Sequence, residues 1–210
     1  MKEKDFFDDG RPHEGLSYDD YLADWRARKD AEPSGTPDKE ERKLRHYLQY
    51  NHERSERVHA RYEPSARLRD ALDSIDEPQL WMVLTEPWCG DSAFCLPVLA
   101  EAARLSEQVT LRILPRDEHL DIMDQYLTGG SRSIPKLVAF AEDDGREVFQ
   151  WGPRPDGAQE RFDDEARKTD NKEDIVKGLL EHYEEGGWQA VDGELAEAIA
   201  SGEKARGGEG

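Results

Sequence analysis

One segment holds most of the residues whose types could carry out chemistry. It reads Glu86-Pro87-Trp88-Cys89-Gly90-Asp91-Ser92, and it joins an apolar run to a predicted helix. Cys89 would therefore stand at a helix N-terminus, where free backbone N–H groups and the helix dipole stabilise an anion. In that setting the pKa of a thiol falls below about 8.5, so the nucleophilic thiolate becomes available. Gly90 lets another backbone approach the sulfur closely.

Two carboxyl groups near the sulfur act in the opposite direction. Asp91 stands two residues after Cys89 and Glu86 three residues before it. A negative charge disfavours a neighbouring thiolate. The helix N-terminus and the Ser92 hydroxyl favour it, so the sequence leaves the direction of the pKa shift at Cys89 open.

The second cysteine is not a partner for the first. Cys95 lies six residues after Cys89 on the same predicted helix, which is about 9 Å along the axis. A disulfide needs Cα atoms within about 7 Å, so the first helical turn would have to unwind. We expect Cys95 to be a small buried residue. We expect no metal site either, because His46, His52 and His59 are spaced as partly exposed helix residues.

Charge and composition exclude several classes of function. The 210 residues include 48 acidic and 29 basic side chains, a formal net charge of −19. This charge repels nucleic-acid phosphates. A membrane span and a secretory signal are not expected, because no sufficiently long apolar run is present. We therefore expect a cytoplasmic protein without nucleic-acid or membrane partners. The even spread of acids favours adaptation to a saline cytoplasm, the alternative being an ordinary acidic protein.

The hydrophobic pattern predicts an α/β fold around the Cys89 segment. Helices are expected at 64–75, 92–105 and 119–127, and strands at 80–85, 109–114, 137–140 and 147–151. A strand, a helix and a second strand indicate a parallel pair. Asp143-Asp144-Gly145 indicates an antiparallel hairpin between the last two strands.

Polar helical extensions flank this region. Residues 1–63 are predicted as an N-terminal extension, with a helix opened by Ser17, a linker at 30–38 and a helix over 37–61. Residues 64–185 form the predicted central domain, which includes an amphipathic helix at 173–183. Residues 186–210 are predicted as a tail with one short helix at 194–199.

Several residues at fixed offsets from Cys89 carry a resemblance. Trp88 and Gly90 flank the cysteine, Pro97 follows it by eight residues, and Ile134-Pro135 lies about 45 residues downstream. With Gly145 and Gly152, this pattern resembles the thioredoxin superfamily. The resemblance implies a three-layer α/β/α domain with a mixed central sheet. It also implies a cis Pro135 packed against the reactive sulfur, and an Ile134 backbone able to pair with an extended substrate.

A narrower resemblance covers nearly the whole chain. It rests on Trp-Cys-Gly-Asp and on four further segments: Leu114-Pro115-Arg116-Asp117-Glu118, Asp124-Gln125-Tyr126-Leu127-Thr128-Gly129-Gly130, Ser131-Arg132-Ser133-Ile134-Pro135-Lys136 and Trp151-Gly152-Pro153-Arg154-Pro155. These resemble a bacterial thioredoxin-like branch that has a single active-site cysteine and helical extensions. The branch implies little about activity.

Two departures from the thioredoxin pattern bear on activity. Ser92 stands where thioredoxins have the second cysteine, which resolves the mixed disulfide. Val83 stands where they have the buried acid that helps to deprotonate that cysteine. Both parts of the internal resolving step are therefore missing.

Three functions remain open. The first is monothiol thiol–disulfide exchange, with catalytic Cys89, no bound cofactor, an external low-molecular-weight thiol as resolver, and a disulfide-containing protein or a small thiol as partner. The residues expected to shape its site are Trp88, Gly90, Asp91, Ser92, Ile134 and Pro135. The second is a redox-inactive binding or structural module. The third, a thiol peroxidase, lacks the usual spacing, because Thr85 precedes Cys89 by four residues.

Other residues near the motif receive structural interpretations. Lys136 is expected as a solvated strand lysine, with an approach to the site as the alternative. Arg116 and Asp117 are expected to form a structural ion pair or a loop hydrogen bond at a strand end, with a role in a ligand cleft as the alternative. The segment Trp151-Gly152-Pro153-Arg154-Pro155 is expected to anchor the exit of the last strand, with a place in the lining of the cleft as the alternative.

Overall fold

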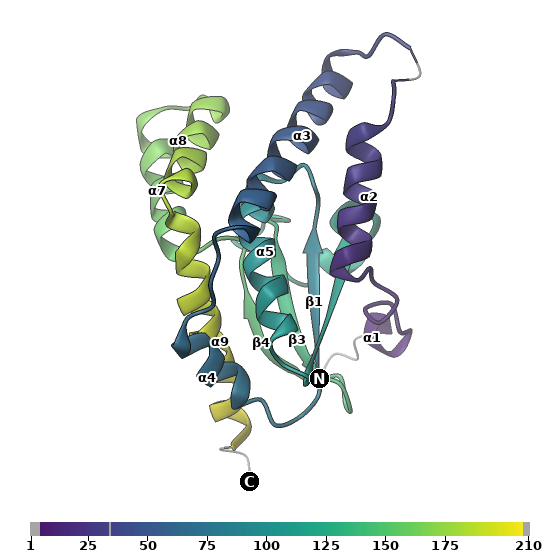
Figure 1. Cartoon of the computed structure of the whole chain (residues 1–210), viewed down its shortest axis with the longest axis vertical. Helices are drawn as coiled ribbons and strands as arrows, with labels where there is room; N and C mark the ends of the chain where they lie inside the picture. The colour runs from purple at the N-terminus through teal and green to yellow at the C-terminus, as the bar shows by residue number, and fades with distance from the viewer. Residues whose placement is uncertain (1–4, 34, 208–210) are drawn as a thin grey trace.

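The computed structural model describes residues 5–33 and 35–207. Its centre is a four-stranded sheet with the order β2-β1-β3-β4. The strands are β1 (Gln79–Thr85), β2 (Val109–Pro115), β3 (Lys136–Ala141) and β4 (Glu147–Trp151). β1 runs parallel to β2 and antiparallel to β3, and β4 is antiparallel to β3. The predicted α/β class, with an early parallel pair and a late hairpin, is confirmed (Figure 1).

The central strand β1 is buried along its whole length, because helices and loops cover both faces of the sheet. Its side chains alternate between two hydrophobic clusters. Trp81 and Val83 belong to one cluster, whereas Met82 and Leu84 belong to the other. Because both faces of β1 are packed, the strand fixes the position of the Cys89 segment that follows it.

The helix that carries the Cys89 segment lies across one face of the sheet. This helix, α5 (Gly90–Arg104), has twelve buried residues and is therefore covered on nearly all sides. It begins two residues earlier than the predicted helix, because Cys89 itself is the N-cap. Pro97 lies inside the helix. Figure 1 shows α3 and α9 flanking α5.

The other face of the sheet has thinner cover. It is packed by the short helix α1 (Asp5–Asp8) and by α6 (Leu120–Met123), which follows the 3₁₀ helix η1 (Arg116–Glu118). α6 is shorter than the predicted helix at 119–127. Leu16 forms a single antiparallel bridge with Ile113 of β2, so the N-terminal segment meets the sheet at this edge.

The N-terminal extension contains the two predicted helices. α2 (Tyr18–Asp30) is capped by the Ser17 side chain, and α3 (Lys39–His59) by the Asp38 side chain. His52 is buried, contrary to the expectation of a partly exposed residue, because its ring packs edge-on against Trp25. The next helix is α4 (Ala66–Asp73).

The C-terminal part is more helical than predicted. The helix α7 (Asp156–Lys168) was not predicted, and it forms a hairpin with α8 (Lys172–Glu184). After the 3₁₀ helix η2 (Gly187–Gln189), α9 (Ala190–Gly207) runs for 18 residues. The expectation of a tail with one short helix at 194–199 is therefore wrong.

The helix α9 is part of the core. Its Val191, Leu195 and Ile199 are fully buried. Gly202 packs so closely on Val148 of β4 that a Cβ would lie 2.8 Å from a side-chain carbon. Glycines at such contacts weaken the helical pattern in the sequence, which explains the short prediction.

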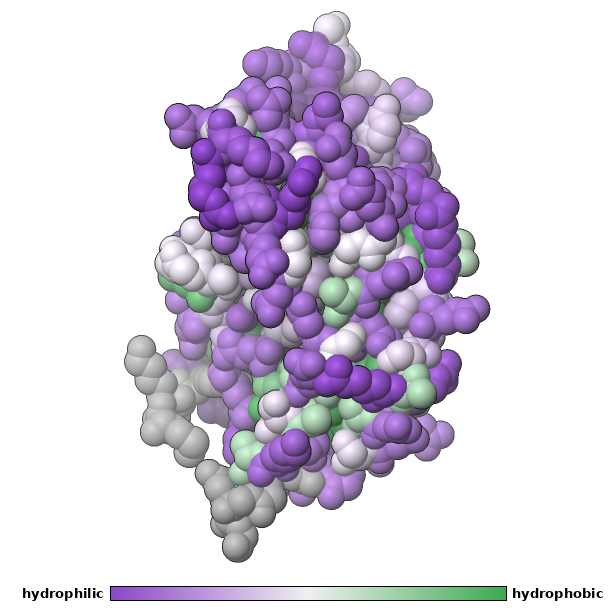
Figure 2. All heavy atoms as spheres, turned by 90° about the vertical axis from the view of Figure 1, so that its left-hand side faces the viewer, coloured by the Kyte–Doolittle hydropathy of each residue, from purple (hydrophilic) through white to green (hydrophobic). Residues whose placement is uncertain are grey.

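The solvent-facing side of the C-terminal helices is polar. Figure 2 shows hydrophilic residues over most of this face, with apolar residues in small patches. Within residues 5–33 and 35–207, every helix is too short or too polar to span a bilayer.

Candidate active site

The thiol of Cys89 lies between the start of α5 and the loop before β3. Its residue is 9% exposed, and its Sγ donates to the carbonyl oxygen of Ile134 at 3.3 Å. The Ile134–Pro135 peptide bond is cis. The fold therefore brings together three residues singled out in the sequence, although 45 residues separate Cys89 from Ile134.

Burial decides the protonation of Cys89. Desolvation raises the pKa of the thiol to about 11, and the negative charge of Asp91 adds to this increase. Hydrogen bonds from the Ser92 hydroxyl and from the backbone N–H groups of Asp91 and Ser92 lower the pKa, but by less. The sequence left open whether the pKa of Cys89 rises or falls. In the folded protein it rises, so the neutral thiol is favoured.

The Ser92 hydroxyl has a defined orientation. Its oxygen accepts a hydrogen bond from the Thr85 hydroxyl at 2.7 Å, and both side chains are buried. The Ser92 proton therefore remains available for the sulfur of Cys89. At the position where thioredoxins have a second cysteine, this chain has a hydrogen-bond donor.

Asp91 is held in a buried ion pair beside the thiol. One carboxylate oxygen accepts from Arg154 at 2.9 Å and the other from the Tyr183 hydroxyl at 2.7 Å. The Asp91 and Arg154 side chains are only 9% and 13% exposed. Burial raises the pKa of Asp91, and Arg154 and Tyr183 oppose this shift.

Arg154 and Tyr183 were not predicted as site residues. Arg154 follows β4, and its guanidinium lies 4.6 Å from the centre of the Phe162 ring of α7. Tyr183 belongs to α8 and stacks on Phe94 of α5 at 4.8 Å. In the sequence Arg154 is part of the quoted Trp151–Pro155 segment, and Tyr183 continues the apolar face of residues 173–183. Neither signal indicated a contact with Asp91.

Cys95 occupies the core beneath the site. It is fully buried and reduced, and its Sγ lies 3.8 Å from the Tyr183 hydroxyl. Burial raises the pKa of this thiol as well. The expectation of a small buried residue is confirmed.

The opposite side of the motif contacts the end of β2. The Arg116 guanidinium lies 5.1 Å from the centre of the Trp88 ring, and it pairs with Asp117 at 2.8 Å. The predicted structural ion pair is therefore present. The buried Glu86 accepts a hydrogen bond from the Asp117 backbone N–H at 2.8 Å, and burial raises the pKa of its carboxyl group.

The residues that surround Pro135 are tightly packed, as Lys136 and Gly152 show. Lys136 is buried in β3, and burial lowers the pKa of its ammonium group. The expectation of a solvated lysine is wrong, because β3 lies inside the sheet and is covered on both faces. Gly152 has φ +107°, and a Cβ there would lie 2.2 Å from the Pro135 oxygen. Only glycine allows this approach.

Two helices that flank α5, namely α3 and α8, contact the motif. From α3, the Asn51 side chain donates to the Pro87 carbonyl oxygen at 3.3 Å. From α8, Leu180 covers Gly90, where an added Cβ would lie 3.1 Å from the leucine Cδ2. No cluster of three or more metal-ligating His, Cys, Asp or Glu side chains occurs within the described residues.

Comparisons with known proteins agree with this architecture. No curated protein matches the chain. Among solved structures, it resembles a protein of unknown function from Pseudomonas aeruginosa, with TM-score 0.56, 17% identity, and coverage of 89% of this chain and 92% of the other. An HIV epitope-scaffold matches with TM-score 0.52, 19% identity, and coverage of 88% and 98%. At these identities the likeness shows the fold alone.

The match to a protein family is more informative. The family profile described as thioredoxin matches residues 38–167, which is more than half of the chain. The matched region contains all four strands, the Cys89 motif and the cis Pro135. The chain belongs to the thioredoxin family.

Proposed function

We propose that this protein is a monothiol thiol–disulfide exchange protein that reacts through Cys89. The observation that carries the proposal is the 3.3 Å contact between the Cys89 sulfur and the Ile134 carbonyl oxygen. It joins the thiol at the α5 N-terminus to the backbone before the cis Pro135, which can pair with an extended disulfide-bearing segment. A reducing compartment such as the cytoplasm would supply the external thiol.

The reaction has two balanced steps. The Cys89 thiolate attacks one sulfur of a disulfide, a new S–S bond forms, and the other sulfur leaves as a thiolate that takes up a proton. An external small thiolate then attacks the mixed disulfide, releases the Cys89 thiolate and carries away the bound half as a new disulfide. Ser92 cannot perform the second step, because a hydroxyl forms no disulfide.

The raised pKa of Cys89 limits the resting rate. With a pKa of about 11, the thiolate is a very small fraction of the protein at neutral pH. We expect exchange to be slow at pH 7 and to become roughly tenfold faster for each pH unit up to about 10.

A second candidate is a redox-inactive module, and the buried Asp91 favours it. This carboxylate raises the pKa of the only thiol near the surface, and Ser92 replaces the resolving cysteine. In this case the helical extensions would carry the function by binding a partner.

We further propose that the chain belongs to the bacterial branch with Trp-Cys-Gly-Asp and one active-site cysteine. The contact of α3 with the motif supports this proposal, because the N-terminal extension then forms part of the site.

The test uses oxidised glutathione as the disulfide probe. The native protein is incubated at pH 7, 8 and 9, and mass spectrometry locates the adduct. Exchange predicts an adduct at Cys89 that increases with pH and is removed by reduced glutathione. Cys95→Ser should retain the adduct and Cys89→Ser should lose it. If Cys89 in the folded protein stays unlabelled at pH 9 while the urea-unfolded chain is labelled, the redox-inactive module is the correct function.

A further inference from the structure

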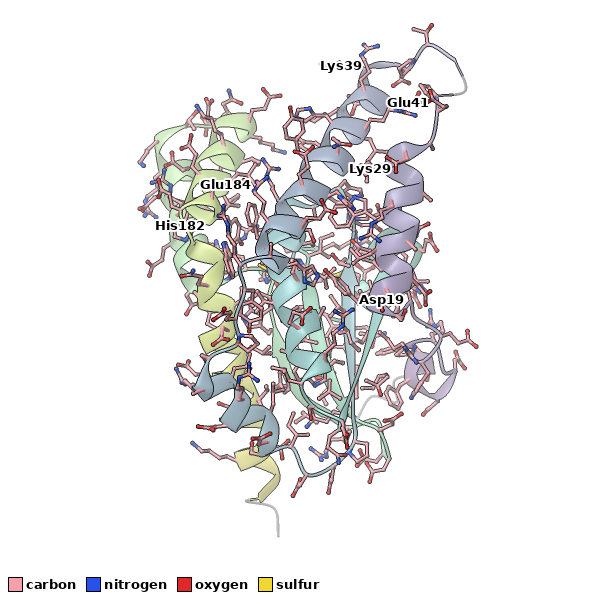
Figure 3. All side chains as sticks on the ribbon, viewed as in Figure 1. Asp19, Lys29, Lys39, Glu41, His182 and Glu184 are labelled. Carbon is pink, nitrogen blue, oxygen red and sulfur yellow. The ribbon has the colours of Figure 1, made fainter. Side chains whose placement is uncertain are left out.

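A groove between α3 and α8 leads toward the Cys89 motif. It has a volume of about 910 Å³ and lies between α3 and α8. In Figure 3, Lys39 marks its outer end on α3, and Glu184 marks the inner part on α8. At the inner end Leu180 lines the groove and also covers Gly90. The groove therefore ends at Leu180, which contacts the residue that follows the reactive cysteine.

The apolar part of the groove would suit a peptide backbone and its side chains. Tyr47, Val176 and Leu180 line it, and Val176 is 40% exposed although it lies on a helix side that faces α3. A volume near 900 Å³ is at the upper end of the range for small-ligand pockets. The groove has room for a short peptide segment.

The outer part of the groove has a charge opposite to that of the protein as a whole. Lys39, Lys43, Lys172 and Lys177 line it, four of the ten lysines of a chain with net charge −19. Within the described part of the chain, no carboxylate pairs with Lys39, Lys43 or Lys172. Of the four lining acids, Glu184 is neutralised by Arg54 and Arg57, and Glu181 faces Lys177. Glu173, near this end, and Glu185, at the other end of α8, are the two lining acids that remain.

The geometry gives the spacing of the expected ligand. Asn51 contacts the motif, and Lys43 lies eight residues earlier on α3, which is about 12 Å along the helix axis. Lys39 lies about 6 Å further out. An extended peptide advances about 3.3 Å per residue, so these lysines would meet side chains about four to six residues from the reacting cysteine.

We propose that the groove binds an extended segment of the disulfide-bearing protein substrate, with acidic side chains four to six residues from its cysteine. This inference rests on the proposed exchange function, and it names the substrate class of the same site. The acidic remainder of the protein repels such a segment and the three lysines attract it. The segment is therefore directed into the groove with its cysteine toward Cys89.

The binding test avoids the reaction itself. Cys89→Ser protein is titrated into fluorescein-labelled peptides that carry one serine in place of the reacting cysteine. The peptides have three glutamates or three lysines four to six positions away, on either the N-terminal or the C-terminal side. Fluorescence anisotropy measures the affinity in about 0.1 M salt, where charges act over about 10 Å.

We expect one glutamate peptide to bind at least about tenfold more tightly than its lysine counterpart. Lys39→Glu/Lys43→Glu/Lys172→Glu should remove this preference. Lys204→Glu on α9, the same substitution outside the groove, is a control that should retain it. Equal affinity for the two peptides, or an unchanged preference in the triple variant, overturns the groove proposal. Circular dichroism checks that each variant is folded.

The two proposals fail in different ways. If the Cys89→Ser protein binds the glutamate peptide but the native protein forms no adduct with oxidised glutathione, the exchange function is wrong and the groove is a peptide-binding site. If the adduct forms but the peptides bind equally, the groove proposal is wrong and exchange stands.

Discussion

Two aspartate–arginine pairs lie on opposite sides of the Cys89 motif and differ mainly in their exposure to water. On the α8 side, Asp91 and Arg154 are 2.9 Å apart with side chains 9% and 13% exposed. On the β2 side, Asp117 and Arg116 are 2.8 Å apart, but the Asp117 side chain is 55% exposed. The distances are nearly equal, so the surroundings decide what each pair does.

The buried Asp91 raises the pKa of Cys89, whereas the exposed Asp117 is not among the main causes of that shift. Asp91 raises the pKa of Cys89, because its field acts through a buried region. Water and salt screen the charge of Asp117. Energetic control of the site therefore lies on the side that contacts the C-terminal helices.

The largest expected effect follows from removing the buried charge. Asp91→Asn leaves the Arg154 guanidinium buried without its counter-charge, which costs about 3–5 kcal/mol of unfolding free energy. The same change lowers the pKa of Cys89 below about 11, because a charge that raises it has gone. Urea unfolding measures the loss of stability. The pH dependence of iodoacetamide alkylation, read by mass spectrometry, measures the pKa, and an unchanged profile would contradict the assigned role of Asp91.

A smaller effect is expected at the tyrosine that ties α8 to the site. Tyr183→Phe removes the 2.7 Å hydrogen bond to Asp91 and should cost about 1–3 kcal/mol. Tyr50→Phe, at a residue 47% exposed, is the matched control and should leave stability nearly unchanged. Equal effects of the two substitutions in urea unfolding would show that the Asp91 contact contributes nothing.

On the exposed side the same chemical change should have little consequence. Asp117→Asn removes a charge from a solvated pair, so we expect less than about 1 kcal/mol of lost stability. The alkylation profile of Cys89 should match that of the native protein. A pKa shift as large as that of Asp91→Asn would contradict the weaker action assigned to the exposed charge on the thiol.

The smallest expected effect is a difference between the two pairs in how their contribution to stability depends on salt. In about 1 M salt the Debye length is near 3 Å, so the small effect of Asp117→Asn should vanish. The cost of Asp91→Asn should persist, because salt does not reach the buried pair. Urea unfolding of both variants at low and high salt tests this difference, and a parallel loss of both effects would count against it. The native protein serves as reference, since adaptation to a saline cytoplasm predicts that its own stability rises with salt.

Local patterns in the sequence were sufficient to predict the central strand, the hairpin and the position of the reactive thiol. The apolar run around Val83 predicted the central strand, and Asp143-Asp144-Gly145 predicted the hairpin. The order Trp88-Cys89-Gly90 located the reactive thiol at the start of α5. Each of these signals depends on neighbouring residues alone, through the alternation of buried side chains, turn chemistry or helix termination.

The sequence by itself therefore determined the α/β fold, the place of Cys89 on it and the absence of a resolving cysteine. Only the tertiary structure decided the protonation of Cys89, the burial of Lys136 and the pairing of Asp91 with Tyr183, 92 residues away. The same holds for α9, whose apolar contacts come from β4 and α4. The reason is physical: desolvation and buried charge pairing depend on which distant segments exclude water, and no local pattern records that.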